Sequence, residues 1–124
     1  MKYIVGIDIG GTNVKAGLVN ASTGELLFST SIKTESEKGV DNTFDRLATL
    51  VDEILEKNNV TKAEVLGIGM GIPGPVINQS VVGFFANFPW PININAKELL
   101  ETRTGLPVKV DNDVNVITAG EAWL

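Results

Sequence analysis

The first candidate for chemistry is a short run near the N-terminus in which two glycines stand between an acid and polar residues. It consists of Asp8-Ile9-Gly10-Gly11-Thr12-Asn13 and follows a stretch rich in Ile and Val. Glycines let the backbone approach a ligand closely, and N–H groups in such a turn can face phosphate oxygens. Thr12 adds a hydroxyl donor, and the Asp8 carboxylate can hold Mg²⁺ through water. The alternative is a hairpin turn whose Asp and Thr only cap the backbone.

A second polar run contains acids and amides in close succession. It consists of Asp111-Asn112-Asp113-Val114-Asn115, between a short predicted strand and a predicted helix. At the carboxyl end of a strand such groups can accept hydrogen bonds from sugar hydroxyls and donate to them. One aspartate beside a hydroxyl can serve as the general base in phosphoryl transfer. The alternative is that Asn and Asp here are ordinary helix caps.

A third run, Gly69-x-Gly71-x-x-Gly74, matches the dinucleotide-binding fingerprint by letter. That fingerprint must open a helix, so that the pyrophosphate meets the helix N-terminus. Pro73 and Pro75 bracket the last glycine, and no acid occurs between Val65 and Glu98. The pattern therefore favours a buried strand followed by a glycine-rich turn.

The composition limits the chemistry further. The 124 residues are 44% hydrophobic and 20% charged, which suits one compact domain with its own core and excludes a disordered chain. Ten basic residues against fifteen acidic ones give a net charge of −5, which disfavours nucleic-acid binding. The chain has no Cys and no His, so disulfides, thiolate or imidazole metal sites and a Ser-His-Asp triad are excluded. Acid–base chemistry must therefore use carboxylates.

No targeting or membrane segment is predicted. The apolar start of the chain is short and meets an acid at Asp8, unlike a signal peptide. The uncharged run from Val65 to Ala96 contains four prolines and five glycines, which a membrane helix would not tolerate. We expect a cytoplasmic protein with no membrane partner.

The elements that must position these residues follow from their hydrophobic patterns. Strands at 3–9, 14–19 and 26–32, joined by short turns, predict an antiparallel meander. An apolar stripe from Val40 to Leu55 predicts a helix that Asp41 or Asn42 could cap. A buried strand follows at 65–71.

The rest of the chain completes an alternating pattern. Residues 76–94 look irregular, with a short hairpin, and Trp90 could pack at an edge of the core. A capping box at Asn95 starts a helix that should end at Gly105. A strand at 108–110 and a last helix from Asn112 or Asp113 follow. The order βββ-α-β-α-β-α predicts one α/β domain with a mixed sheet.

Taken together and in this order, four runs resemble the motifs of the ROK family. That family comprises bacterial and archaeal glucokinases, related sugar and amino-sugar kinases, and sugar-responsive repressors. The runs are 7–13, 69–76, 86–90 and 110–115, so the resemblance spans essentially the whole chain. It implies that residues 1–124 form the N-terminal lobe of an actin-like, ribonuclease-H-like kinase fold.

The resemblance also implies a reaction and a role for particular residues. The reaction would be ATP-dependent phosphorylation of a hexose or amino-sugar hydroxyl, with ATP and Mg²⁺ as cofactors. Asp113 would be the catalytic base that takes the proton from the sugar hydroxyl. The ATP phosphates would meet Asp8, Gly10, Gly11, Thr12 and Asn13, with Asp8 also holding Mg²⁺ through water, and the sugar would be held by Gly74, Asn87, Asn112 and Asp113.

The sequence departs from the family pattern in three respects. Most relatives carry Glu where Asp111 stands, and the position of Asn13 is often Lys. The family's second phosphate-contacting Gly-Thr-Gly segment, its sugar-binding Glu and His and its Cys/His zinc cluster belong to a C-terminal lobe absent from this chain. We therefore expect a fragment or single domain of a longer kinase, inactive by itself and ending in an inter-lobe helix.

Two other classes of function stay open. A ROK repressor would sense sugar without phosphorylating it, but such proteins carry a helix-turn-helix module before the first strand, and only a few residues precede that strand here. A free-standing binding module could instead form a homodimer through the apolar surface left by the missing lobe. The motifs do not say which sugar is the substrate.

Overall fold

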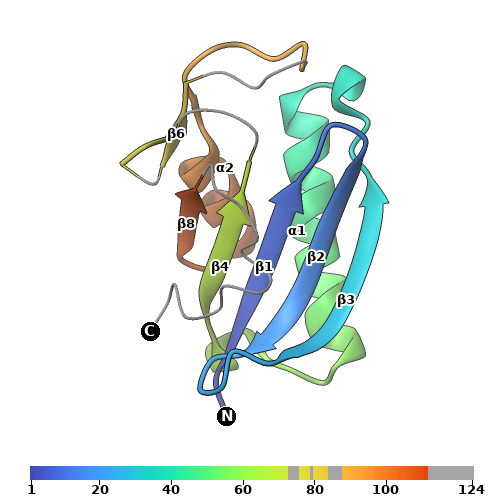
Figure 1. The fold of residues 1–124 in the computed structure, drawn as a ribbon, viewed down its shortest axis with the longest axis vertical. Coiled ribbons are helices and arrows are strands. Elements are labelled where there is room, and N and C mark those ends of the chain that lie inside the picture. Colours follow the sequence, from blue (N-terminus) through green and yellow to red (C-terminus); the bar gives the residue numbers. More distant parts are fainter. Residues whose placement is uncertain (73–75, 79, 84–87, 112–124) are drawn as a thin grey trace.

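A five-stranded mixed sheet forms the centre of the fold (Figure 1). The computed structural model describes residues 1–72, 76–78, 80–83 and 88–111. The strand order is β3-β2-β1-β4-β8; β1 pairs antiparallel with β2 and parallel with β4, while β2–β3 is antiparallel and β4–β8 parallel. The five strands are β1 (Tyr3–Ile9), β2 (Asn13–Asn20), β3 (Leu26–Lys33), β4 (Val65–Gly71) and β8 (Val108–Asp111).

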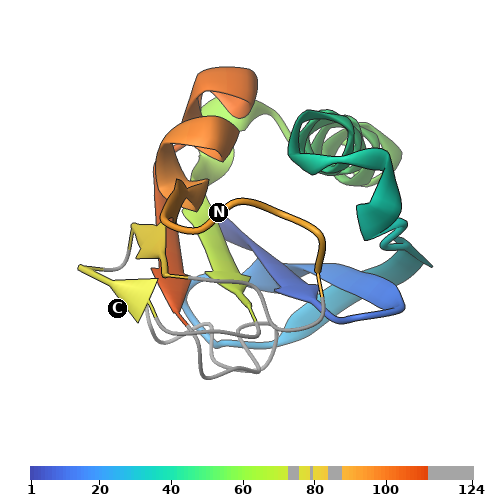
Figure 2. The same cartoon turned by 90° about the horizontal axis from the view of Figure 1, so that it is seen from above.

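The two helices of the described residues cover the same face of this sheet, as the view from above shows (Figure 2). Helix α1 (Val40–Lys57) connects β3 to β4, and α2 (Ala96–Thr104) precedes β8. Short 3-10 turns, η1 (Ser36–Lys38) and η2 (Lys62–Glu64), flank α1. Helical crossovers of this kind are what parallel strand pairs require.

A second, small antiparallel sheet lies between β4 and α2 in the chain. It consists of β5 (Val76–Ile77), β6 (Val81–Val82) and β7 (Ile94–Asn95), in the order β5-β6-β7. The hairpin expected within 76–94 is therefore confirmed, and a third short strand extends it.

The core lies between the main sheet and the two helices. Alternate residues of β1, namely Val5, Ile7 and Ile9, pack with Phe44 and Leu47 of α1 in one buried cluster. The register continues this row of apolar side chains into the neighbouring strands, because cross-strand partners share a face. The residues between them in β1, including Asp8, therefore face the side of the sheet away from the helices.

The predicted start of α1 is wrong in one respect. Neither Asp41 nor Asn42 caps the helix, because α1 begins at Val40 and its N-cap is Gly39, two residues before Asp41, with φ +97° and no side-chain cap bond. Asp41 instead pairs with Arg103 of α2 at 3.1 Å, and the amide oxygen of Asn42 accepts from Arg46. Asp41 is thus used in a contact between the two helices and Asn42 in a contact within α1, and neither side chain caps the helix.

The predicted limits of α2 are confirmed. The Asn95 side chain accepts from the Glu98 N–H at 3.0 Å, and Gly105 ends the helix with φ +74°, its N–H bonded to the Glu101 carbonyl at 2.8 Å. Gly69 and Gly71 lie inside β4, as expected of a buried strand rather than a helix-opening loop. The last predicted helix, from Asn112 or Asp113, lies outside the described residues. Within the described ranges, neither helix has the length and apolar character needed to cross a membrane.

Gly105 offers a test of this helix end. Nothing lies within 4 Å of where its Cβ would be, so a side chain at this position would not clash with a neighbouring atom. It would be strained only by the left-handed backbone conformation. We predict that Gly105→Ala lowers the free energy of unfolding of the chain by about 1 kcal/mol in urea denaturation. Gly105→Asn should lose clearly less, because Asn tolerates this conformation better. Equal losses for the two variants would contradict this explanation.

Candidate functional site

Three parallel strands bring two carboxylates and a glycine into one row at their carboxyl ends. Asp8 of β1 is the register partner of Gly71 in β4, and Gly71 is the partner of Asp111 in β8. Residues paired in this way share a face of the sheet. At the usual strand spacing the Cα atoms of Asp8 and Asp111 are about 10 Å apart. Ligands of open α/β sheets bind outside this edge.

The row continues into the antiparallel part of the sheet. On the other side of β1, the register partner of Asp8 is Lys15 of β2. Lys15 is exposed. Asp8 is half-buried and Asp111 exposed. A base and two acids therefore line one face of the sheet beside the turn that follows β1.

The turn between β1 and β2 is closed by its own backbone. The Gly10 N–H donates to the Asn13 carbonyl at 2.9 Å. A Cβ on Gly10 would lie 2.8 Å from that carbonyl oxygen, which is closer than real Cβ atoms come, so this position requires glycine. A Cβ on Gly11 would meet nothing within 4 Å. Gly10 is therefore needed for the turn itself, whereas Gly11 borders open space.

The outer part of this turn presents donors to solvent. Gly11, Thr12 and Asn13 are exposed. In the described part of the chain, the N–H groups of Gly11 and Thr12 donate to no protein acceptor. Exposed neighbouring N–H groups of this kind can bind an anion such as phosphate. The five predicted phosphate-binding residues therefore all lie at one turn or just before it. They are Asp8, Gly10, Gly11, Thr12 and Asn13.

Thr34, which no pattern in the sequence marked as a site residue, supports the turn from behind. Its side chain is fully buried, just after β3. Its hydroxyl donates to the Gly10 carbonyl at 2.8 Å, and its N–H donates to the Thr12 carbonyl at 2.9 Å. No local signal marks a Thr at this position, because both partners lie more than twenty residues away in the chain.

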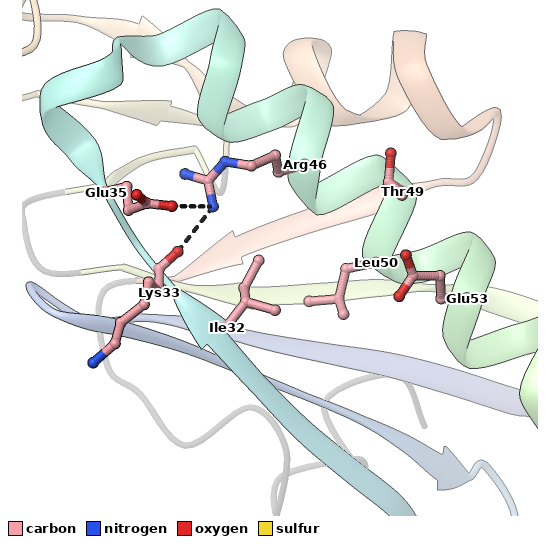
Figure 3. Close-up of a pocket in the computed structure, with 7 residues that line it drawn as sticks. All are labelled: Ile32, Lys33, Glu35, Arg46, Thr49, Leu50 and Glu53. Carbon is pink, nitrogen blue, oxygen red and sulfur yellow. Dashed lines mark hydrogen bonds and ion pairs between the residues drawn. The ribbon is translucent and has the colours of Figure 1, made fainter.

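Arg46 of α1 holds the segment that contains Thr34 (Figure 3). Its guanidinium donates to the Lys33 carbonyl at 2.8 Å, to the Thr34 carbonyl and to the Asn42 side chain at 2.9 Å. It stands in a groove of about 420 Å³ between β3 and α1. Glu35 lies 3.9 Å from it, and a hydrogen bond and charge from Lys38 lower the pKa of Glu35 below its ordinary value.

Trp90 anchors the segment after the predicted sugar-binding Asn87. Its indole N–H donates to the Ser36 carbonyl at 2.8 Å. Its ring packs edge-on against Phe88 at 4.8 Å between centroids, and lies 6.2 Å from Phe44 of α1. The expectation that Trp90 packs at the edge of the core is confirmed, since it is 9% exposed.

The remaining predicted site residues lie outside the described residues: Gly74, Asn87, Asn112 and Asp113. In the sequence each stands within two residues of the described end of a segment, Ile72, Phe88 or Asp111. Among the described residues, no group of three or more acids, His or Cys could hold a metal ion. The oxygen donors of Asp8 suit Mg²⁺, which is usually bound by one or two carboxylates with its remaining positions filled by water and phosphate.

The two glycines of the turn give a matched test. We predict that Gly10→Ala lowers the free energy of unfolding by about 1–3 kcal/mol, because its Cβ collides with backbone that closes the turn. Gly11→Ala should change it by less than about 0.5 kcal/mol, because its Cβ meets open space. Urea denaturation of both variants checks the pair. Similar stabilities for the two would contradict the geometry of the turn.

The sequence of this chain is similar to those of known glucokinases and of a putative xylose repressor. The chain is 32% identical to a glucokinase of Halalkalibacterium halodurans and 34% identical to one of Thermotoga maritima, covering 98% and 97% of this chain but 37% and 36% of those proteins. It is 31% identical to a putative xylose repressor of a Caldicellulosiruptor species, covering 97% of this chain and 30% of that protein. The chain therefore spans about a third of the length of these relatives.

A similar solved structure is that of a ROK family glucokinase from Streptomyces griseus in complex with glucose and AMPPNP. It superposes with a TM-score of 0.78 at 30% identity, over 92% of this chain and 34% of that one. The likeness agrees with the mixed sheet and its helices, and the fold is that of the actin-like sugar kinases. Because the ROK family model matches residues 4–124, almost the full length of the sequence, this chain belongs to the ROK family.

Proposed function

We propose that this chain is the N-terminal lobe of a ROK hexose kinase, which transfers the γ-phosphoryl group of ATP to a sugar hydroxyl. The observation that carries the proposal is the turn after β1, where exposed N–H groups of Gly11 and Thr12 stand beside the carboxylate row. Glucokinases among the relatives support the same reaction.

The turn supplies what a phosphate chain needs. Phosphoryl transfer depends on positioning and on neutralising charge more than on covalent chemistry with the protein. The N–H groups of Gly11 and Thr12 and the Thr12 hydroxyl would donate to phosphate oxygens, and the missing side chain at Gly11 leaves room for close approach. Asp8 would hold Mg²⁺ through water, and the metal would neutralise negative charge on the phosphates.

The sugar side of the reaction would depend on predicted site residues that lie outside the described part of the chain. Asn87, Asn112 and the Gly74 turn would hold the sugar hydroxyls. Asp113 would accept the proton of the attacking hydroxyl, whose oxygen bonds to the γ-phosphorus while the bond to the β–γ bridging oxygen breaks. The products are a sugar phosphate and ADP.

The reaction also requires the second lobe. Closure of two lobes around the substrates excludes water, which would otherwise compete as the phosphoryl acceptor. A chain that spans about a third of its relatives offers one wall of that cleft.

We predict that the 124-residue chain alone, incubated with ATP, Mg²⁺ and glucose, forms no ADP above background and binds ATP only weakly. The reason is that half of a cleft neither orients both substrates nor excludes water. Coupled measurement of ADP formation checks the activity, and titration calorimetry checks the binding. Appreciable turnover by the chain would contradict the two-lobe proposal.

In the full-length protein, we predict that Asp113→Asn abolishes phosphoryl transfer, by a factor of about 10² or more, while the sugar still binds. The amide keeps the hydrogen-bonding shape but cannot take the proton. Steady-state kinetics and sugar titration test the two halves. Asp52→Asn is the matched control and should leave turnover unchanged, because Asp52 is an exposed carboxylate on α1 whose salt-bridge partner within the described ranges is Lys62. Near-normal turnover of Asp113→Asn would overturn the base assignment.

A sugar-sensing regulator is the second candidate, because two of the similar relatives carry the name of a xylose repressor. Such a protein would use the same sugar contacts without transferring phosphate. Turnover of ATP with a hexose by the full-length protein separates the two, since only the kinase consumes ATP when sugar is present.

A further inference from the structure

We propose that Thr34 is a positioning residue of the nucleotide site: its hydroxyl sets the direction in which the Gly11 N–H points, and α1 holds Thr34 in place through Arg46. The inference rests on the proposed function in that the ligand of the turn is a nucleotide phosphate. It adds a residue that lies outside the motif and touches no ligand itself.

The first step is the pair of hydrogen bonds that Thr34 makes to the turn. The hydroxyl binds the carbonyl of Gly10 at 2.8 Å and the N–H binds the carbonyl of Thr12 at 2.9 Å. These carbonyls belong to the Gly10–Gly11 and Thr12–Asn13 peptide groups. One residue therefore holds the two peptide groups on either side of the exposed Gly11–Thr12 pair.

The second step follows from peptide geometry. None of the described peptide bonds is cis, and in a planar trans peptide the C=O and the following N–H point in opposite directions. When the Gly10 carbonyl points at Thr34, the Gly11 N–H must point away from it, on the exposed side of the turn. Glycine has no Cβ to restrict this peptide, so the hydroxyl of Thr34 replaces the restraint that the residue itself lacks.

The third step is the anchoring of Thr34. Arg46 donates to the carbonyl of Lys33 (Figure 3) and also to the carbonyl of Thr34. The backbone on each side of the Thr34 α-carbon is therefore tied to α1. The Arg46 side chain is itself oriented by Asn42, one turn earlier on the helix. The end of β3 thereby becomes a rigid support between the helix and the turn.

The fourth step is the chemistry of the buried side chain. Thr34 is fully buried, and valine would fill the same space without the hydroxyl. Only the hydrogen bond to Gly10 would be lost, and the carbonyl would be free to rotate. Valine could supply the volume of the Thr34 side chain. The hydroxyl is therefore needed to orient the Gly10–Gly11 peptide.

Thr43 provides a matched control. It is also a buried threonine, one turn into α1, and its hydroxyl has no hydrogen-bond partner in the described part of the chain. Replacing Thr43 by Val removes the same atom from a similar environment without touching the turn. Thr34→Ser is the rescue variant, because it keeps the hydroxyl.

The test uses the full-length protein and compares Thr34→Val, Thr34→Ser and Thr43→Val with the unaltered chain. For Thr34→Val we expect the KM for ATP to rise about tenfold, as befits the loss of one buried hydrogen bond, while the KM for the sugar changes less than about twofold. Thr34→Ser and Thr43→Val should keep both KM values. All assays run below the unfolding transition of every variant, which excludes loss of folded protein as the cause.

A second measurement does not depend on turnover. The order parameter of the Gly11 N–H, from ¹⁵N relaxation without nucleotide, should fall in Thr34→Val toward the range of flexible backbone, below about 0.6, and stay high in Thr43→Val. An unchanged KM for ATP together with an unchanged Gly11 order parameter in Thr34→Val would overturn the proposal. If the unaltered protein binds no nucleotide, the proposed function fails, and the order parameter alone then decides whether Thr34 orients the turn.

Discussion

The candidate site depends on the position of β1 in the middle of the sheet. Backbone hydrogen bonds on both sides tie β1 to an antiparallel neighbour, β2, and to a parallel neighbour, β4. The antiparallel neighbour forces a tight turn directly after Ile9, while the parallel ones end at the same edge as β1. Because of this one mixed arrangement, a glycine turn and the carboxyl ends of β4 and β8 stand together.

The apolar face of the sheet makes this arrangement stable enough to hold polar groups at its edge. Val5, Ile7 and Ile9 of β1 face the helices and are almost fully buried, and Phe44 and Leu47 of α1 belong to the same cluster. Burial of apolar side chains stabilises the folded state by about 25 cal/mol per Å². The packing of β1 against α1 therefore supplies a large share of the stabilisation that the core gives to the strand before the turn. The opposite alternate residues, Asp8 among them, are thereby assigned to the other face.

Much of the fold could be predicted from local patterns in the sequence. Runs of β-branched residues marked the main strands, the 3.6-residue period marked α1, and Asn95 and Gly105 marked both ends of α2. These signals succeed because each depends on residues within a few positions of one another. The start of α1 was mispredicted for the opposite reason, since Asp41 is engaged by Arg103, 62 residues away.

For the candidate site, the sequence by itself determined which types of residue are available to bind ligands. They are an acid near the end of β1, a glycine pair with no side chains, and a second acidic run that begins at the end of β8. Only the tertiary structure decided that Asp8, Gly71 and Asp111 share one row, and that Thr34 and Arg46 hold the turn from behind. The physical reason is that strand register and helix docking join residues far apart in the chain, which no local pattern encodes.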